Sequence, residues 1–524
     1  MKKLFRLLII SITALVLTLS LASCTKDVGS AEELHKATKN GNVEVTNYSV
    51  SKYKGSKNNI EIAADFTVRT DEEFFTERIG DLDFKDYIPG RMMQDCTING
   101  NGHTITIKGE SNGSLGRYSA GLFARLMNCE VKDLNIVYDI DLSLSSSNSM
   151  GGLAAVAENC TITNVTVTYK RSADFWGYRA GGIVGLFSGT MENCTVTGDF
   201  KTSTEHFGAL VGGLDGGTVK NCIVNGSVVA TNLHNSEIGG LFGWMQGEAY
   251  QNKATLSKFS VAGKTDKWTT YNSYCGALVG KIYGNLHDCM LEFTDGATVD
   301  ATEHSSGSFR TNMHTGVVAG WAAKGSKINN IFIDATVGSS ANITFPEKSK
   351  SVALGIYKNE STSVENVYYL EDLLVHQHKE RLDATESKVS GSHDTVYSFT
   401  MCGKECSARI CFTESKENTG AYHVTSILLK IGGEEYSLTE RVDDNPLKPI
   451  FKASIDGFTY EATVSVEGLF VDFSKTLNGC FEGGAAFVTD CADINLAGEA
   501  GVIGGAESSW KINADGKPQL KAFE

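Results

Sequence analysis

The residues with catalytic potential are scattered along this sequence. The 11 histidines include one close pair, His376 and His378, and no H-E-x-x-H pair that could hold zinc beside a general base. The close pair is more typical of a solvated loop. No two cysteines have the C-x-x-C spacing of a structural zinc site. The sequence therefore predicts neither a metal site nor a cofactor.

The carboxylates do not form a catalytic pattern. Hydrolysis of a glycosidic bond requires two carboxylates held at a set separation. A column of acidic residues at one repeat position would be the sign of such a pair, and the sequence has none. Acidic residues fall at unrelated offsets in segments that we expect to be loops: Asp174, Asp199, Glu205, Glu237 and Asp266. We predict that the protein is not an enzyme; a catalytic site assembled from loops stays open.

Aromatic residues are the strongest candidates for ligand contacts. They cluster in segments that we expect to be variable loops emerging on one edge of a repeat structure. Rings with polar handles, interleaved with Asn, Thr and His, suit a glycan or protein ligand. The competing interpretation is that the rings fold back and cover strand edges. The candidate ligand-binding residues are Phe175, Trp176, Tyr178, Trp268, Tyr271 and Tyr274.

The chain contains 13 cysteines, enough for a disulfide framework in an exported protein. Most of them occupy repeat positions, however, and buried cysteine packs as a small apolar residue. We therefore expect free thiols in the core. Two sets of three share a repeat position: Cys96, Cys129 and Cys160, and Cys194, Cys222 and Cys289. The state of five others stays open, with one disulfide among them as an alternative: Cys402, Cys406, Cys411, Cys480 and Cys491.

A five-residue motif, G-[GA]-[LIV]-[VFA]-G with substitutions, recurs through the middle of the chain. An Asn or Asp and a short apolar strand follow the copies at a near-constant distance. A period of about 30 residues with two or three short strands suits a parallel β-helix, whereas a propeller blade needs four strands. The eight copies start 27 to 40 residues apart, at Ala120, Gly151, Gly181, Gly208, Gly239, Gly276, Gly316 and Ser351.

These repeats can bury their apolar faces only by stacking. Strands stacked in register about 4.8 Å apart place like residues over like and form one continuous core. Glycine is expected at sharp corners and close backbone approaches. Stacked Asn side chains are expected to bond along the stack. The predicted fold is all-β, a right-handed parallel β-helix with a small antiparallel β-domain inserted near the C-terminus.

The repeat resembles the GLUG motif of bacterial adhesin-like proteins over residues 95–370. The similarity extends to both ends. Ser30 and Glu33 form a capping box for a short helix, and Trp510 with residues 515–520 resembles the family's closing segment. The resemblance implies a cell-surface adhesin. Some IgA-directed metalloproteases carry the same motif, but the H-E-x-x-H sequence that they would need is absent.

The N-terminus predicts export. A basic start and an apolar stretch over residues 7–22 are typical of a secretory signal peptide. Leu21-Ala22-Ser23-Cys24 resembles the lipobox of bacterial lipoproteins, which implies lipid attachment at Cys24 and a stable membrane anchor. The alternative is an ordinary cleaved signal with a chance cysteine. Thr25 at the next position resembles an outer-membrane signal, so we expect a lipid-anchored, surface-exposed protein of the outer membrane.

The net charge of −15, with no basic block, argues against nucleic acid as a partner. We expect an adhesin or ligand-binding protein for a host glycan or protein. The alternatives are a structural spacer that displays the segment 375–470, or a polysaccharide-degrading enzyme by analogy of fold. The expected segments are 1–23 (lipoprotein signal peptide), 24–94 (linker and cap), 95–370 (β-helix), 375–470 (antiparallel β-domain) and 471–524 (closing segment).

Overall fold

The computed structural model describes the greater part of the chain after Cys24. The described residues are 25–38, 43–46, 49–53, 55–70, 92–109, 119–263, 271–302, 305–306, 309–334, 342–344, 362–370, 374–376, 380–381, 385–401, 404–414, 422–431, 434–441, 450–455, 458–465, 468–473, 485–488 and 508–523. The chain divides into two compact units, unit 1 over Met1–Ile223 and unit 2 over Val224–Glu524.

Both units are built almost entirely of β-strands, which confirms the predicted all-β class. Within the described ranges the helices are α2 (Ala31–Thr38) and a single 3-10 turn, η4 (Lys521–Phe523). Neither is long and apolar enough to cross a membrane. Cys24, the predicted lipid-attachment residue, lies just outside the described residues.

Unit 1 begins with short strands and continues with longer ones. Its strands are β1 (Thr25–Val28), β2 (Val43–Thr46), β3 (Ser49–Tyr53), β4 (Asn59–Ile62), β5 (Phe66–Arg69), β6 (Met92–Gln94), β7 (Thr97–Asn99), β8 (Thr104–Lys108), β9 (Ser119–Ala120), β10 (Phe123–Met127), β11 (Glu130–Tyr138), β12 (Leu142–Gly151), β13 (Ala154–Tyr169), β14 (Ala173–Gly181), β15 (Val184–Glu192), β16 (Thr195–Gly208) and β17 (Val211–Lys220).

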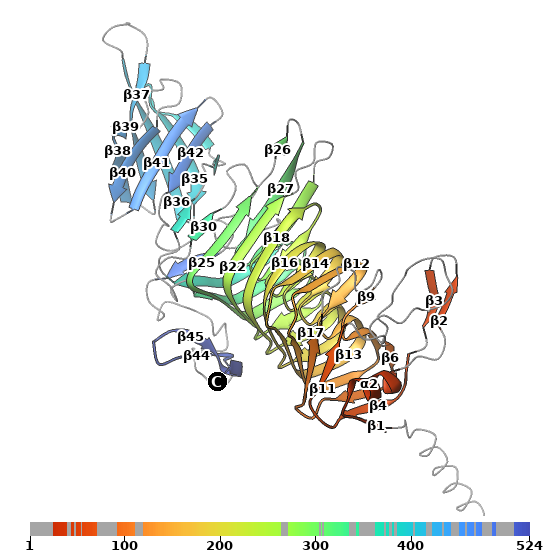
Figure 1. The fold of residues 1–524 in the computed structure, drawn as a ribbon. Coiled ribbons are helices and arrows are strands. Elements are labelled where there is room, and N and C mark those ends of the chain that lie inside the picture. The colour runs from red at the N-terminus through yellow and green to blue at the C-terminus, as the bar shows by residue number, and fades with distance from the viewer. Residues whose placement is uncertain are drawn as a thin grey trace, which may run out of the picture. The chain divides into compact units, whose positions relative to one another are not determined.

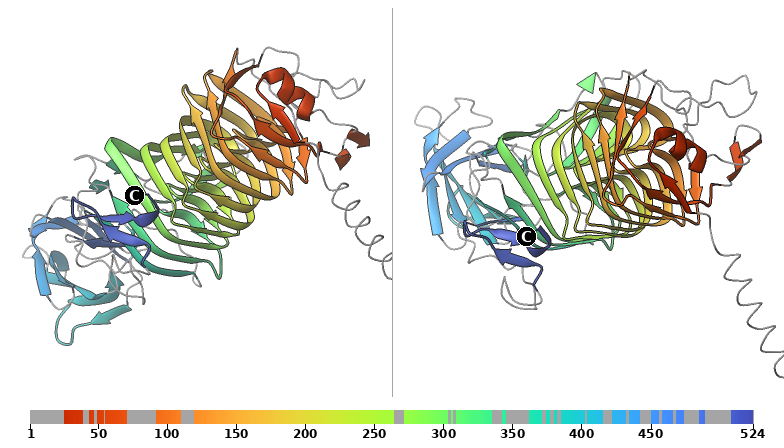
Figure 2. Two further views of the ribbon diagram at one scale, coloured as in Figure 1. Left: turned by 90° about the horizontal axis from the view of Figure 1, so that it is seen from below. Right: turned by 60° about the horizontal axis from the view of Figure 1, so that its bottom comes forward.

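The strands of unit 1 pair in parallel with the strands one repeat later, as the views in Figure 2 show. We call residues that share one register position in successive strands a column. Phe123, Ala154, Val184 and Val211 form such a column, and all four are buried. Because they are the fourth residues of successive motif copies, the spacing of the motif sets the register of the stack.

The second glycine of the motif allows the chain to pass very close to its neighbour. A Cβ atom on Gly182 would lie 2.0 Å from the carbonyl oxygen of Ala209 and 2.8 Å from Cγ2 of Val196. The carbonyl of Gly182 also accepts a hydrogen bond from the Tyr169 hydroxyl at 2.8 Å. Any side chain at this position would therefore push the adjacent turn away.

Asparagine and aspartate form the corners that follow each motif. Asn128 and Asn159 have φ of 51° and 50°, the left-handed region that Asn tolerates better than most residues. The Asn128 amide donates to Oδ1 of Asp95 at 2.8 Å, and the Asn159 amide donates to Oδ1 of Asn128 at 2.9 Å. A second column repeats this contact between Asn164 and Asp133 at 2.8 Å. The predicted side-chain ladder is thus confirmed.

The parallel stack of unit 1 starts well before residue 95. β1 pairs in parallel with β4, β4 with β7 and β5 with β8. These early strands are only three to five residues long, too short for a clear periodic signal. The backbone N–H of Glu33 donates to Ser30 Oγ at 3.2 Å at the start of α2, as the capping sequence predicts.

The stacked thiols of both units are buried and unpaired by disulfides, as predicted. Cys96 lies between β6 and β7 and Cys129 at the matching turn between β10 and β11, with their sulfur atoms 3.5 Å apart, and both are free. Burial raises the pKa of Cys289 to about 12, so this thiol stays protonated and unreactive. Cys411 is free and half-buried. The remaining open cysteines, Cys402, Cys406, Cys480 and Cys491, have side chains outside the described residues.

Unit 2 contains further parallel strands. They are β18 (Ile223–Leu233), β19 (Glu237–Gly239), β20 (Phe242–Met245), β21 (Glu248–Tyr250), β22 (Lys253–Gly263), β23 (Tyr271–Gly276), β24 (Val279–Ile282), β25 (Asn285–Thr302), β26 (Ser305–Ser306), β27 (Phe309–Gly316), β28 (Ala319–Ala322), β29 (Lys327–Asp334), β30 (Asn342–Thr344), β31 (Ser363–Leu370), β32 (Leu374–His376) and β43 (Ala485–Val488). The hairpin partner β26 is antiparallel to β27.

Two antiparallel sheets interrupt this parallel pattern (Figure 1). Alternating residues of the first sheet, such as Ala408 and Ile410, are buried, which is the pattern of a sheet with one covered face. The first sheet contains β34 (Thr385–Lys388), β35 (Thr395–Met401), β36 (Lys404–Glu414), β37 (Tyr422–Ile431) and β38 (Glu434–Leu438). The second contains β33 (Glu380–Arg381), β39 (Glu440–Arg441), β40 (Ile450–Ile455), β41 (Phe458–Ser465) and β42 (Gly468–Phe473).

Candidate ligand-binding surface

The most exposed aromatic residues of unit 1 lie on the outer face of β14. Trp176 is 52% exposed and Tyr178 is 37% exposed. Strand alternation explains Trp176, because its neighbour Phe175 faces inward. Between the two exposed rings Gly177 has a φ of 115°, and the register shifts there against β12. The alternation is kept there nonetheless: Tyr178 lies two residues after Trp176 and therefore faces the same side.

The prediction that Phe175 contacts a ligand is wrong. Its side chain is fully buried, with ring centroids 5.9 Å from Phe207, 6.3 Å from Phe200 and 6.3 Å from Tyr169. The segment that carries Phe175 is also a strand and not the expected variable loop. In a strand only alternate side chains can face outward, so Phe175 and Trp176 cannot serve on the same surface.

Trp176 projects from a region of small residues. Its register partners are Ser145 on β12 and Ser203 on β16. The indole is more than half exposed. An exposed indole of this kind offers a large apolar face and one N–H donor, which suits a ligand that combines apolar and polar groups.

Tyr178 is held by its neighbours. The imidazole of His206 meets its ring edge-on at a centroid distance of 5.0 Å, and the guanidinium of Arg179 lies 4.9 Å from the ring centroid. Arg179 is only 8% exposed, and it donates to Ser149 Oγ at 3.4 Å. The site therefore combines a fixed phenol with a projecting indole and contains binding groups rather than a nucleophile.

The other predicted ligand-binding residues divide between the described and undescribed parts of the chain. Trp268 lies outside the described residues, and Tyr271 is described only as part of the backbone of β23. Tyr274 belongs to unit 2, where it stacks on His314 at 4.9 Å.

The prediction that the scattered acidic residues lie in loops is wrong for four of them. These four lie in strands: Asp174, Asp199, Glu205 and Glu237. Asp266 lies outside the described residues.

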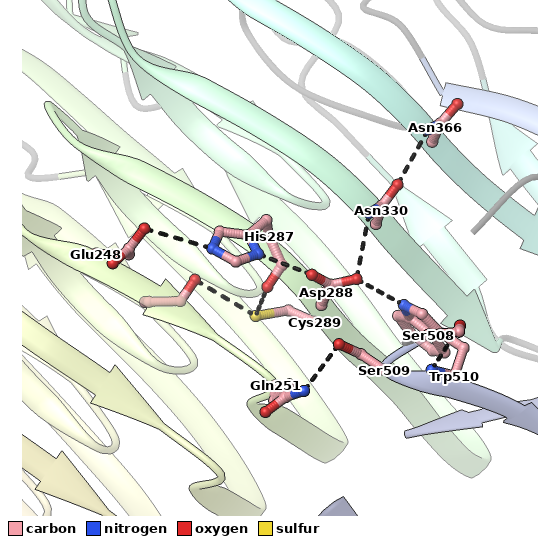
Figure 3. A network of polar contacts seen from close by, with 11 residues as sticks. Glu248, Gln251, His287, Asp288, Cys289, Asn330, Asn366, Ser508, Ser509 and Trp510 are labelled. Atoms are coloured by element: carbon pink, nitrogen blue, oxygen red, sulfur yellow. Dashed lines mark hydrogen bonds and ion pairs between the residues drawn. The ribbon is translucent and has the colours of Figure 1, made fainter. Parts of the chain in front are cut away.

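Unit 2 contains a polar network that first resembles a catalytic site (Figure 3). Nδ1 of His287 lies 2.8 Å from Oδ2 of Asp288, and Nε2 lies 3.6 Å from Oε1 of Glu248. The ring stacks on Tyr250 at 5.0 Å. Burial of the ring disfavours its charge, but the hydrogen bonds and charges of Asp288 and Glu248 outweigh this effect and raise the pKa of His287 above its ordinary value.

The neighbouring thiol cannot act as a nucleophile for this histidine. Cys289 is fully buried, and its sulfur donates to the backbone carbonyl of His287 at 3.2 Å. Its raised pKa keeps it protonated. Both oxygens of Asp288 are also occupied, since Oδ1 accepts from Trp510 Nε1 at 2.9 Å and from the Asn330 amide at 3.2 Å. In the described part of the chain, no group of three metal-ligating side chains occurs.

The network instead attaches the closing segment, residues 508–523. This segment forms a hairpin of β44 (Trp510–Ile512) and β45 (Pro518–Leu520). Trp510 is fully buried against Met290, Phe332 and Leu520. Its polar attachments include Trp510 to Asp288 at 2.9 Å, Gln251 to Ser509 Oγ at 2.8 Å, and Lys517 to Asp334 at 3.0 Å.

The raised pKa of His287 predicts that this attachment weakens at high pH. The pKa of His287 is higher in the folded state than in the unfolded state, where it is about 6.5. The protonated ring therefore stabilises the folded state fully below about pH 6.5, and this contribution is lost as the pH rises through the folded-state pKa. Hydrogen exchange of residues 508–523, corrected for intrinsic rates, should therefore accelerate as the pH rises above about 6.5. The acceleration should disappear in His287→Gln and persist in the surface control His423→Gln. Equal exchange profiles against pH for these two variants and the wild type would refute the role of His287.

No known protein family, no characterised protein and no solved structure matches this chain. The functional assignment therefore depends on the geometry of the chain itself. In that geometry Trp176 and Tyr178 form an exposed pair of rings on β14, whereas the groups around His287 hold the closing segment.

Proposed function

We propose that this protein is a surface lipoprotein that binds an extracellular ligand, either a glycan or a protein, through the outer face of β14. The observation that carries the proposal is the exposure of Trp176 at 52% beside the held ring of Tyr178. Exposed aromatic residues with polar handles dominate the binding energy of many recognition surfaces. The exposed half of this indole is available for contact with a ligand.

The proposed anchor is a lipid at Cys24, in the outer membrane and with the protein on the cell surface. The sequence Leu21-Ala22-Ser23-Cys24 supports it. Two or three acyl chains would hold the protein on a membrane stably. Mass spectrometry of the mature N-terminus tests this proposal directly, because a free thiol at Cys24 would contradict it.

We propose further that the stacked strands wind as a right-handed parallel β-helix of the GLUG type. Support comes from the parallel pairing of strands one repeat apart, for example β13 with β15 and β15 with β17. The motif supplies the residues at matching register positions. In such a fold, outward-facing residues of successive strands share one surface, which places β14 among neighbours that can extend its binding face.

The binding proposal predicts that the double variant Trp176→Ala/Tyr178→Ala loses its ligand. We expect affinity to fall by at least about tenfold, because truncation of a central aromatic contact costs about 2 kcal/mol or more. The assay is an array of glycans and extracellular-matrix proteins probed with the chain that lacks residues 1–24, followed by titration of each hit.

Lys201→Ala is the matched control, since Lys201 is an exposed residue on the adjacent strand β16, opposite Asp174. It should bind like the wild type. Thermal unfolding of each variant must match the wild type, because both substituted aromatic residues are exposed. Hits that survive the double substitution would exclude the β14 face as the binding surface.

A second candidate function is that of a spacer that displays the two antiparallel sheets. It is supported by their difference from the repeats, since antiparallel strands occupy Glu380–Phe473. Deletion of residues 380–473 separates the two functions: a spacer loses all binding, whereas the β14 site is retained. Catalysis on polysaccharide has less support, because the network around His287 has its carboxylates and thiol committed to other contacts.

A further inference from the structure

Two adjacent columns on unit 2 place large polar and aromatic residues next to one another. Glu237, Tyr274 and His314 share one register position on β19, β23 and β27. Trp244, Lys281 and Trp321 share another on β20, β24 and β28. Strands about 4.8 Å apart hold these side chains at a fixed spacing. The cluster is therefore rigid, because its geometry is set by the register of the strands.

Three aromatic rings surround the ammonium group of Lys281. Its Nζ lies 4.9 Å from the ring centroid of Trp321, 5.0 Å from that of Tyr274 and 5.1 Å from that of Tyr283. The rings also contact one another: Trp321 lies 5.9 Å from Tyr274 and 5.7 Å from Tyr283. Each contact lies within the range of a cation–π or aromatic pair. We call Glu237, Tyr274, Lys281, Tyr283, His314 and Trp321 the Lys281 cluster.

The charge of Lys281 is balanced inside the cluster. Its Nζ lies 3.2 Å from Oε1 of Glu237, and the two side chains are only 17% and 12% exposed. Burial works against the lysine charge, but Tyr283 and Glu237 outweigh it and raise the pKa of Lys281. The ion pair persists at neutral pH, and the cluster presents no net charge.

This balance restricts the ligand. An acidic ligand would have to compete with Glu237 for Lys281, and a cationic ligand would have to approach an ammonium group already enclosed by the rings. A neutral polyhydroxyl ligand avoids both costs, since its hydroxyls can accept from Lys281 and donate to Glu237. Its C–H faces can pack on the rings, of which Tyr283 is 43% exposed.

We propose that the Lys281 cluster is a binding site for neutral glycans, separate from the β14 surface. Tyr283 and Trp321 provide the apolar face, and the Lys281–Glu237 pair orients the sugar hydroxyls. The proposal goes beyond the binding function assigned to unit 1, because it concerns different residues and commits to an uncharged ligand.

The test measures binding of the full chain in detergent micelles to soluble neutral polysaccharides built of glucose, mannose or galactose. Calorimetry or affinity electrophoresis reports the dissociation constant. Tyr283→Ala and Lys281→Met should each weaken binding by at least about tenfold, and Tyr283→Phe should bind like the wild type. Tyr283 is exposed, so both Tyr283 variants should retain the wild-type melting temperature. Lys281→Met leaves Glu237 without its ion-pair partner at 12% exposure and should melt below the wild type, so its binding is measured at a temperature where circular dichroism shows it folded.

The Trp176→Ala/Tyr178→Ala protein is the discriminating control, and it should bind the neutral polysaccharide unchanged. Three results would overturn the inference: no binding to any neutral polysaccharide, equal binding by Tyr283→Ala and wild type, or Lys281-dependent binding of acidic polysaccharides only. Binding lost in the Trp176/Tyr178 variant but kept in the Lys281 cluster variants would overturn it while supporting the function proposed for β14.

Discussion

Replacement of Trp510 with alanine should release the closing segment from unit 2. The indole is fully buried among Met290, Phe332 and Leu520, and its Nε1 donates to Asp288. Truncation of a buried tryptophan costs about 3–5 kcal/mol, and the polar contacts of Ser509 and Lys517 cannot offset this. We expect hydrogen-exchange protection of β44 and β45 to fall by about 100-fold or more, with new protease cleavage in the same segment.

Ile512→Ala is the matched control for this experiment. Ile512 lies on the same strand as Trp510 but is 44% exposed. Its truncation should change protection by less than about 0.5 kcal/mol, the usual range for surface substitutions. If the two variants exchange alike, the closing segment is not held by the Trp510 contact.

Substitution of Gly182 by alanine should disrupt the stack of unit 1. The new methyl group would clash with the carbonyl oxygen of Ala209, a backbone atom in the bend between β16 and β17 that cannot move without displacing these strands. Overpacking in a close-packed interior costs about 1–3 kcal/mol and occasionally more, and a backbone obstacle belongs at the upper end. We expect a melting temperature lowered by several degrees for the unit 1 transition, or loss of soluble protein.

Gly29→Ala serves as the control, because a Cβ there would meet its nearest neighbour, Ala64, at an ordinary distance of 3.7 Å. This variant should melt within about a degree of the wild type, as expected for a change of less than 0.5 kcal/mol. Scanning calorimetry of the three proteins gives the comparison. Equal melting of Gly182→Ala and the wild type would show that the second motif glycine is not required by the close approach.

The register of the repeats could be predicted from the sequence because the motif itself sets it. The fourth motif residues Phe123, Ala154, Val184 and Val211 form a buried column. The corner asparagines were predictable for the same reason, since the left-handed turn and the side-chain ladder both favour Asn. Early strands such as β1 and β4 were not, because four residues contain too few alternations to distinguish a strand from a linker.

The ligand-binding residues were predicted only in part. Phe175 and Trp176 are adjacent aromatic residues, so composition identifies a candidate binding segment but does not indicate which of the two rings faces outward. The column supplies that information: Phe175 aligns with the buried Leu144 on β12 and with the buried Thr202 on β16. Assignment of the inner and outer faces therefore requires the register of the neighbouring strands.

Tyr274 was the one member of the Lys281 cluster predicted to bind a ligand; the rest were missed because the members are up to 84 positions apart, from Glu237 to Trp321. The sequence nevertheless contains a signal. Trp244, Lys281 and Trp321 each follow the last residue of a motif copy directly, and the Glu237 column lies two residues before each first glycine. Alignment of the copies would bring these positions together. The contact of Trp510 with Asp288 could not be predicted by aligning the copies, because Trp510 lies outside the repeat and 222 positions after Asp288.

The corner ladders run in one direction. At the corners named above, each amide donates to the residue one repeat earlier: Asn128 to Asp95, Asn159 to Asn128 and Asn164 to Asp133. The same order occurs from Asp288 through Asn330 to Asn366. Each of these turns therefore meets a side-chain oxygen as its acceptor, whereas Gln251, at the corner before Asp288, donates to Ser509 of the closing segment. Repeats that carry the Asn corner could be duplicated or lost by recombination without leaving a mismatched hydrogen bond, so the length of such a protein can evolve independently of the chemistry that holds it together.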